Sequence, residues 1–284
     1  NLIRERYPQI KTVSVFGGEE DDPPQYGKVV ISLIPNRNIP LINDGLKSDI
    51  ITYLKKYNIT TEPVIVDPEM MYAEVTSTVQ YSPTSTTKTE MQLKELINNQ
   101  IVKYEDKFLV NFGNDLRRSK LSTYIDAADS SIVSSMTDLR AILRITPLKA
   151  SGIQKIDITF ARPLNRSIKA SYSANESPVI KSSNFSYYVR KRNRVYSSYL
   201  ADDGTGVLNI YTVNTKNQVE VLEKKVGSVN YKTGRILIDL DVYDYTNYIE
   251  IFGKMASDDI TVGNRKFLQI DYNNLNISLV KAQN

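Results

Sequence analysis

The sequence contains no cysteine, no histidine and no tryptophan. Structural and catalytic zinc sites are built mainly from thiolate and imidazole ligands, so the usual zinc centres cannot form. A Ser-His-Asp or Cys-His nucleophilic centre also lacks its base. Disulfides are excluded, which fits a reducing compartment. We therefore expect no catalytic residue, no metal site and no bound cofactor.

Long apolar segments are missing as well. No run of about 18 apolar residues occurs, and the first ten residues have no signal-peptide core, so we expect no contact with a membrane. The sequence opens on Asn1 and not on methionine, so we interpret it as a piece of a longer polypeptide. Its net charge of +4 is modest and makes nucleic acid an improbable partner.

What is present is an ordinary globular composition, with 41% hydrophobic and 24% charged residues in 284 positions, enough for one large or two ordinary domains. Residues 1–26 are expected to hold a leading strand and an acidic loop. The four consecutive carboxylates at 19–22 are the oxygen ligands that hard cations prefer. Adjacent side chains do not converge easily on one ion, so a solvated turn is the favoured interpretation.

Residues 27–147 have the pattern of an α+β domain. The strand at 28–34 is apolar on both faces, as interior strands are, whereas residues 72–81 alternate as a half-buried strand does. Asn43 or Asp44 can cap the first helix, and Thr87 with Glu90 forms a capping-box pattern ahead of the second. In order, the expected elements are strand 28–34, helix 43–57, strand 64–66, strand 72–81, a helix ending near 104, helix 116–128 and a strand within 132–146. This order predicts a ferredoxin-like or split βαβ layer with an extra helix.

From residue 148 the pattern becomes β-rich. Short β-branched segments are separated by turn signals such as Asp203-Gly204 and Lys232-Thr233-Gly234, at spacings typical of antiparallel sheets. The expected strands are 153–160, 179–189, 207–213, 219–226, 235–242, 248–252 and 267–272. We predict a sandwich-like β domain over 148–284.

The succession YGKVVISLIP, a helix, EPVIVDPEMMYAEVTSTVQY, a helix and FGNDLRRSKLSTYIDAADSSIVSSMTDLRAIL resembles the baseplate J-like family of contractile-tail phages over about residues 13–146. The GGEEDDPPQYGKV opening is similar to that of its T-even-type wedge subunits. The resemblance implies a structural subunit, not an enzyme, in the virion tail baseplate, assembled in the host cytoplasm. It further implies a homodimer or ring of identical subunits, contacts with other wedge proteins, a part in relaying the contraction trigger, and no small-molecule substrate.

Two tyrosine-rich stretches are the candidate contact residues. Read as one extended strand, residues 187–196 place alternate tyrosines and arginines on one face. That arrangement could grip single-stranded nucleic acid or could anchor a protein interface. It could also be an exposed strand or hairpin whose charges prevent edge pairing. The candidate interface residues are Tyr188, Arg190, Arg192, Arg194, Tyr196, Tyr199, Tyr243, Tyr245 and Tyr248.

Asp239 and Asp241 alternate on one predicted strand and could mimic the carboxylate pair of a glycoside hydrolase. A polar outer face explains them more simply, because isoleucine and leucine occupy the alternate positions. The leading hypothesis is therefore a structural subunit, with a nucleic-acid-binding module as the alternative and a hydrolase as a third.

Overall fold

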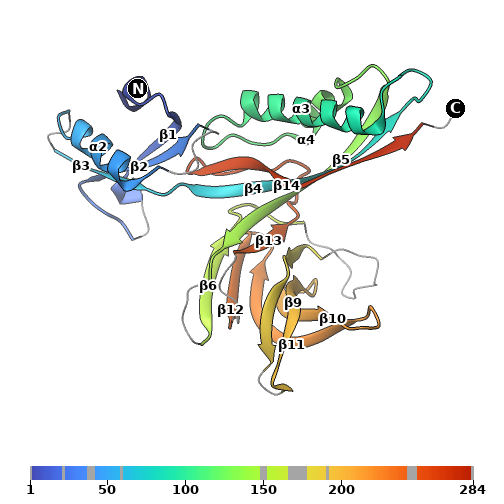
Figure 1. Ribbon diagram of the computed structural model, residues 1–284. Helices are drawn as coiled ribbons and strands as arrows, with labels where there is room; N and C mark the ends of the chain where they lie inside the picture. The colour runs from blue at the N-terminus through green and yellow to red at the C-terminus, as the bar shows by residue number, and fades with distance from the viewer. Residues whose placement is uncertain are drawn as a thin grey trace.

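A computed structural model describes residues 2–20, 23–36, 42–57, 60–147, 152–165, 178–189, 192–241 and 248–282. Three parts are visible in Figure 1: an N-terminal lobe, a central sheet covered by two helices, and a β lobe that projects from the middle of the central sheet. The fold is mixed α+β with mostly strand, which confirms the coarse fold class. None of the helices in the described ranges is long and apolar enough to cross a membrane.

The N-terminal lobe is a three-stranded sheet with a helical crossover. Its elements are α1 (Leu2–Arg6), β1 (Ile10–Gly17), the 3-10 turn η1 (Gly18–Glu20), β2 (Lys28–Pro35), α2 (Asp44–Leu54) and β3 (Glu62–Val66). The order is β1-β2-β3, with β2 and β3 parallel because α2 carries the chain back between them. Ile31, Leu33 and Ile50 form its small core. Asn43 caps α2, since its Oδ1 accepts from the Leu46 N–H at 2.8 Å.

The central sheet consists of β4 (Glu69–Tyr81), β5 (Ile132–Ile145) and β14 (Lys266–Lys281). Of β5, residues 132–142 pair with β4. The helices α3 (Glu90–Phe108) and α4 (Arg118–Asp126) cover one face. The alternation of β4 directs Ala73, Val75 and Val79 to that face, where they pack with Ile97 and Ile101 of α3, and all five are fully buried.

The start of α3 differs from the predicted capping box. Thr89, not Thr87, is the N-cap, and Gln92 completes the box in the place expected for Glu90. The same Thr-x-x-Glu/Gln pattern occurs twice in this stretch, two residues apart. Sequence alone does not decide between them, because either start leaves the same side chains facing the core.

In the part of the β lobe that the structure describes, the strands are β6 (Gln154–Thr159), β7 (Ile180–Ser182), β8 (Phe185–Val189), β9 (Arg194–Asp202), β10 (Val207–Val213), β11 (Val219–Asn230), β12 (Arg235–Leu240) and β13 (Ile249–Gly253). They follow the order β13-β7-β9-β10-β11-β12-β6 within a single sheet, and β8 adds to β9. A bridge between Leu164 and Met255 brings the chain after β6 against the chain after β13. The β-rich character predicted for this region is therefore confirmed, with the strands in one hydrogen-bonded sheet, whereas the sandwich-like arrangement is not confirmed.

The last strand also departs from expectation. The predicted strand 267–272 runs on to Lys281 and pairs in parallel with β4, about 200 positions earlier in the chain, not with the β lobe. Asn273 and Asn274, which resemble a turn in the sequence, instead lie in a register shift between Ile270 and Leu275. The ferredoxin-like layer is not confirmed, because β1–β3 form a sheet separate from β4 and β5.

One strand, β5, joins the central sheet to the β lobe. Ala141 of β5 is paired with Ala73 of β4 on one side and with Gly253 of β13 on the other. Ile142 is likewise paired on both sides, and from Leu143 to Ile145 β5 continues with β13 alone. A Cβ atom on Gly253 would lie 2.7 Å from the Phe160 ring, which is fully buried, so this crossing requires glycine.

We predict that Gly253→Ala destabilises the fold by about 1–3 kcal/mol, because the added methyl group overpacks the buried Phe160 ring. Denaturant unfolding followed by circular dichroism measures the change. Gly263→Ala is the matched control, since a Cβ atom added there would project into open space. Equal stability of the two variants would contradict a tight crossing at Gly253.

Candidate interaction surfaces

A buried ionic cluster fastens the β lobe to the central sheet. Arg144 of β5 donates from Nη2 to Asp271 at 2.6 Å and from Nε to Glu250 at 3.0 Å. The Asn274 amide donates to the same two carboxylates, at 2.9 and 3.2 Å. Only 6% of the Asp271 side chain and 13% of the Glu250 side chain are exposed. The cluster thus connects β5, β13 and the register shift of β14 through charge-assisted hydrogen bonds.

Two tyrosine rings enclose the same guanidinium group. The Arg144 guanidinium carbon lies 3.8 Å from the centroid of Tyr72 and 4.6 Å from that of Tyr248. Cation–π contacts of this kind hold the planar group in place and shield it from water. Tyr248, a candidate interface residue, is 46% exposed and therefore belongs both to this joint and to the surface.

Residues 187–196 form a hairpin and not a single extended strand, so the interpretation as one strand is wrong. β8 ends at Val189 and pairs antiparallel with β9, which begins at Arg194. Asn193 supplies the left-handed residue of the turn, with φ of +48°. Tyr188 pairs with Val195 and Tyr187 with Tyr196, so Tyr188 and Tyr196 lie on opposite faces.

The basic residues near this turn gather around Tyr196. The guanidinium groups of Arg192 and Arg194 lie 5.8 and 5.3 Å from its ring centroid, and Arg192 forms a 2.8 Å ion pair with Glu220. The single-faced Tyr/Arg row on which the nucleic-acid interpretation depended is therefore not formed by these residues. Arg190, Tyr243 and Tyr245 lie outside the described residues.

The opposite face of the same strands carries an exposed apolar surface, which we call the Tyr–Val face. Tyr199 is paired with Tyr211, Tyr211 with Val221, and Val213 with Val219. The Tyr199 and Tyr211 rings stack at 5.7 Å, and burial raises the pKa of Tyr199 above its ordinary value. The members of the Tyr–Val face are Tyr188, Val195, Tyr199, Tyr211, Val213, Val219 and Val221.

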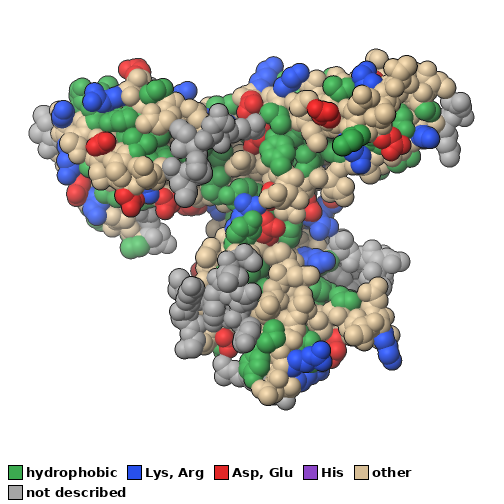
Figure 2. All heavy atoms as spheres, viewed as in Figure 1, with side chains coloured by type: hydrophobic (Ala, Val, Ile, Leu, Met, Phe, Trp, Pro, Cys, Tyr) green, Lys and Arg blue, Asp and Glu red, His purple; other side chains and the backbone are tan. Residues whose placement is uncertain are grey.

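The Tyr–Val face contains unusually exposed valines. Val213 is 50% exposed, Val219 61% and Val195 38%, and Lys181 lies over the Tyr199 ring at 4.9 Å. Protein interfaces are enriched in tyrosine and poor in charge at their centres, which is the composition found here. Hydrophobic side chains reach the surface of the β lobe in Figure 2 as well. Sequence analysis found only Tyr188 and Tyr199 of this set.

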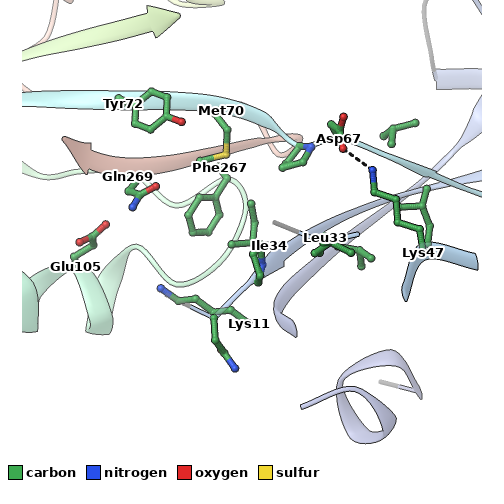
Figure 3. A pocket seen from close by; sticks show the side chains of 16 residues that line it. Lys11, Leu33, Ile34, Lys47, Asp67, Met70, Tyr72, Glu105, Phe267 and Gln269 are labelled. Carbon is green, nitrogen blue, oxygen red and sulfur yellow. Dashed lines mark hydrogen bonds and ion pairs between the residues drawn. The ribbon is translucent and has the colours of Figure 1, made fainter. Parts of the chain in front are cut away.

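A crevice separates the N-terminal lobe from the central sheet. Its volume is about 370 Å³, and Ile34, Met70 and Phe267 contribute to its apolar wall (Figure 3). Glu105 of α3 reaches the crevice and is only 2% exposed. Its carboxylate accepts from the Tyr272 hydroxyl at 2.7 Å and from the Ile270 N–H at 3.3 Å. These two hydrogen bonds tie the Glu105 carboxylate to β14.

The predicted carboxylate pair of a hydrolase does not converge on a cleft. Asp239 is exposed on the outer face of β12 and lies opposite Lys155 of β6, as a polar outer face requires. In the acidic loop, Glu20 forms an ion pair with Arg265 at 3.1 Å. Within the described ranges, no group of three or more acidic side chains is arranged to hold a metal ion.

Comparison with known proteins adds information on the kind of protein that carries these surfaces. Residues 1–66 match the family model described as baseplate structural protein gp6, C-terminal domain I, and residues 69–143 match that of gp6 C-terminal domain III. The baseplate wedge protein gp6 of Enterobacteria phage T4 is 27% identical over 100 residues, which cover 35% of this chain and 15% of that protein.

Over residues 1–66 and 69–143 the chain is thus similar to structural proteins of phage baseplates. The matches give no support to the nucleic-acid-binding alternative, and they favour a structural protein over an enzyme. The boundary between the two family models falls between β3 and β4, where the N-terminal lobe meets the central sheet. The aligned part is a small fraction of the T4 protein, and both family models end before the β lobe.

We predict that Arg144→Ala lowers the free energy of unfolding by about 3–5 kcal/mol, because it leaves Asp271 and Glu250 buried without their cation. Arg144→Lys should lower the free energy of unfolding by less, since lysine keeps the positive charge but cannot make both hydrogen bonds. Urea unfolding followed by circular dichroism measures both. Arg235→Ala, which removes an exposed pair with Asp157, is the control with a much smaller expected change. If Arg144→Ala had the same free energy of unfolding as the parent, the cluster would not stabilise the joint.

Proposed function

We propose that this chain is a structural part of the baseplate wedge of a contractile phage tail, where it docks on copies of itself and on other wedge proteins. The observation that carries the proposal is the pair of adjoining matches to baseplate structural domains over residues 1–66 and 69–143. We further propose that the chain is related to the baseplate J-like family and that its subunits form a dimer or ring. The sequence resemblance over residues 13–146 supports this relation.

The arrangement of the parts suits a relay of movement. The β lobe joins the rest of the chain through the shared strand β5, and the Arg144 cluster fixes the joint on the side of β13 and β14. A partner bound to the β lobe would therefore transmit a rotation to the central sheet without bending in between, as rigid subunit rotations do in other assemblies.

The Tyr–Val face is the surface that we assign to a neighbouring wedge protein. It lies on β8, β9, β10 and β11, its members are tyrosines and valines, and Lys181 over Tyr199 is the charged group beside them. Tyr188 and Tyr199 remain candidate interface residues as part of this face. Arg192, Arg194 and Tyr196, on the other face, are candidates for a separate contact.

The location is tested by labelling. The chain has no cysteine, so Thr87→Cys, in the exposed loop before α3, gives a single site for maleimide-gold. We expect particles assembled with the labelled chain to carry gold at the tail baseplate in electron cryomicroscopy. Gold on the capsid or along the tail tube, or failure of the folded chain to assemble into particles, would overturn the proposal.

The Tyr–Val face is tested by a pair of charges. We expect Val213→Lys with Val219→Lys to lower the free energy of unfolding by no more than about 1 kcal/mol, because the two opposed lysines replace side chains that are at least half exposed. Incorporation into particles should fall several-fold, since two cations would be desolvated on docking. Met91→Lys is the control, because Met91 is 82% exposed on α3, outside the face. Equal incorporation of both variants would exclude this face as a contact.

A further inference from the structure

The sheet edges of this molecule are not equally protected. An unpaired edge strand can accept a strand from another chain, and proteins block such edges with proline, charge, shortness or a covering element. The edge strand β3 has five residues and contains Pro63, and β6 has six residues with Lys155 and Asp157. On β1, the Thr12 hydroxyl lies 3.1 Å from the Asn111 side chain, and β8 has only five residues. Each of these edges carries at least one such feature.

The strand β14 is different in its second half. Before the register shift, the Ile270 N–H donates to Glu105, so α3 covers the edge there. After it, the segment 275–281 reads Leu-Asn-Ile-Ser-Leu-Val-Lys, with no proline, no glycine and no charge before Lys281. Among the described residues, β4 is its one strand partner, and it lies on one side only. Figure 1 shows this segment at the end of the sheet, running toward the C-terminus.

We propose that residues 275–281 of β14 pair antiparallel with the same segment of a second copy of this chain, across a two-fold axis at Ser278. The proposal deepens the proposed self-association of wedge subunits and assigns it to one edge. The two central sheets would join into one six-stranded sheet, with α3 and α4 of both copies on the same face.

The segment is self-complementary in this register. Leu275, Ile277 and Leu279 face the helices, as their partners Val75, Ser77 and Val79 do on β4, while Asn276, Ser278 and Val280 face the open side. Pairing about Ser278 places Ile277 opposite Leu279, Asn276 opposite Val280, and Lys281 opposite Leu275. The alternation is preserved on both faces, and no like charges meet.

A second copy fits this edge better than an unrelated strand does. A closed pair of identical subunits requires the same patch on both, and an antiparallel strand pair is the arrangement in which one edge can serve both partners. A parallel pairing of the same edge would turn the second sheet over, so that its helix-covered apolar face would adjoin the open polar face of the first.

The axis is tested by cysteine cross-linking, which the absence of natural cysteine makes specific. We expect Ser278→Cys to form a disulfide-linked dimer under mild oxidation, because a residue on the axis meets its own copy at about 4.5–5.5 Å between Cα atoms. Ser134→Cys, on the same open face but on β5 at the far side of β4, is the control and should stay monomeric on non-reducing gels. Equal cross-linking of the two variants would contradict the proposed axis.

The register is tested by paired charges in sedimentation velocity over a concentration series. Asn276→Lys with Val280→Lys opposes two lysine pairs and should weaken the dimer about tenfold. Asn276→Lys with Val280→Glu opposes lysine to glutamate twice and should restore parent-like association. A monomeric parent at every concentration, or equal association of both variants, would overturn the inference. The labelling of tail baseplates does not depend on this edge, so failure of the proposed function is recognised separately.

Discussion

The structure depends on the double pairing of β5. At Ala141 and Ile142 this strand is hydrogen-bonded to β4 on one side and to β13 on the other, so the central sheet and the β lobe share one backbone. A shared strand restricts relative movement more than a flexible linker does, because rotation would break ladder hydrogen bonds. The close packing of Gly253 on Phe160 and the Arg144 cluster act at the same crossing, and both require that the two sheets meet at a fixed angle.

The surfaces available for contacts lie away from this joint. The Tyr–Val face occupies one side of the β lobe, and the free half of β14 lies at the end of the central sheet (Figure 1). At the joint, by contrast, the charged side chains of Arg144, Asp271 and Glu250 satisfy one another. This distribution suits a rigid connector, in which the interior fixes the geometry and the ends bind neighbours.

The sequence predicts local elements well and long-range pairing poorly. The strand 28–34, the helix at 43–57 and the alternating strand 72–81 are found close to their predicted positions, because hydrophobic period is a local property. The pairing of β14 with β4 is not encoded in any local pattern. The Tyr–Val face was not predicted, because β10 is apolar on both sides: Leu208 and Ile210 face the core, whereas Tyr211 and Val213 face outward. The sequence pattern does not show which side is exposed. The turn at Asn193 had a recognisable signal, since asparagine tolerates a left-handed backbone.

The parallel ladder between β4 and β14 also bears on how the chain reaches its native state. Its partners are separated by about 200 positions, so β4 emerges from the ribosome long before its neighbour exists. Contacts of such high sequence separation form late and slow the overall reaction. During that interval β4 has an open side within a strongly β-forming sequence, which is a state prone to non-native association. Pairing of β14 thus covers the open side of β4 and ends the period in which the nascent chain is prone to non-native association at that side.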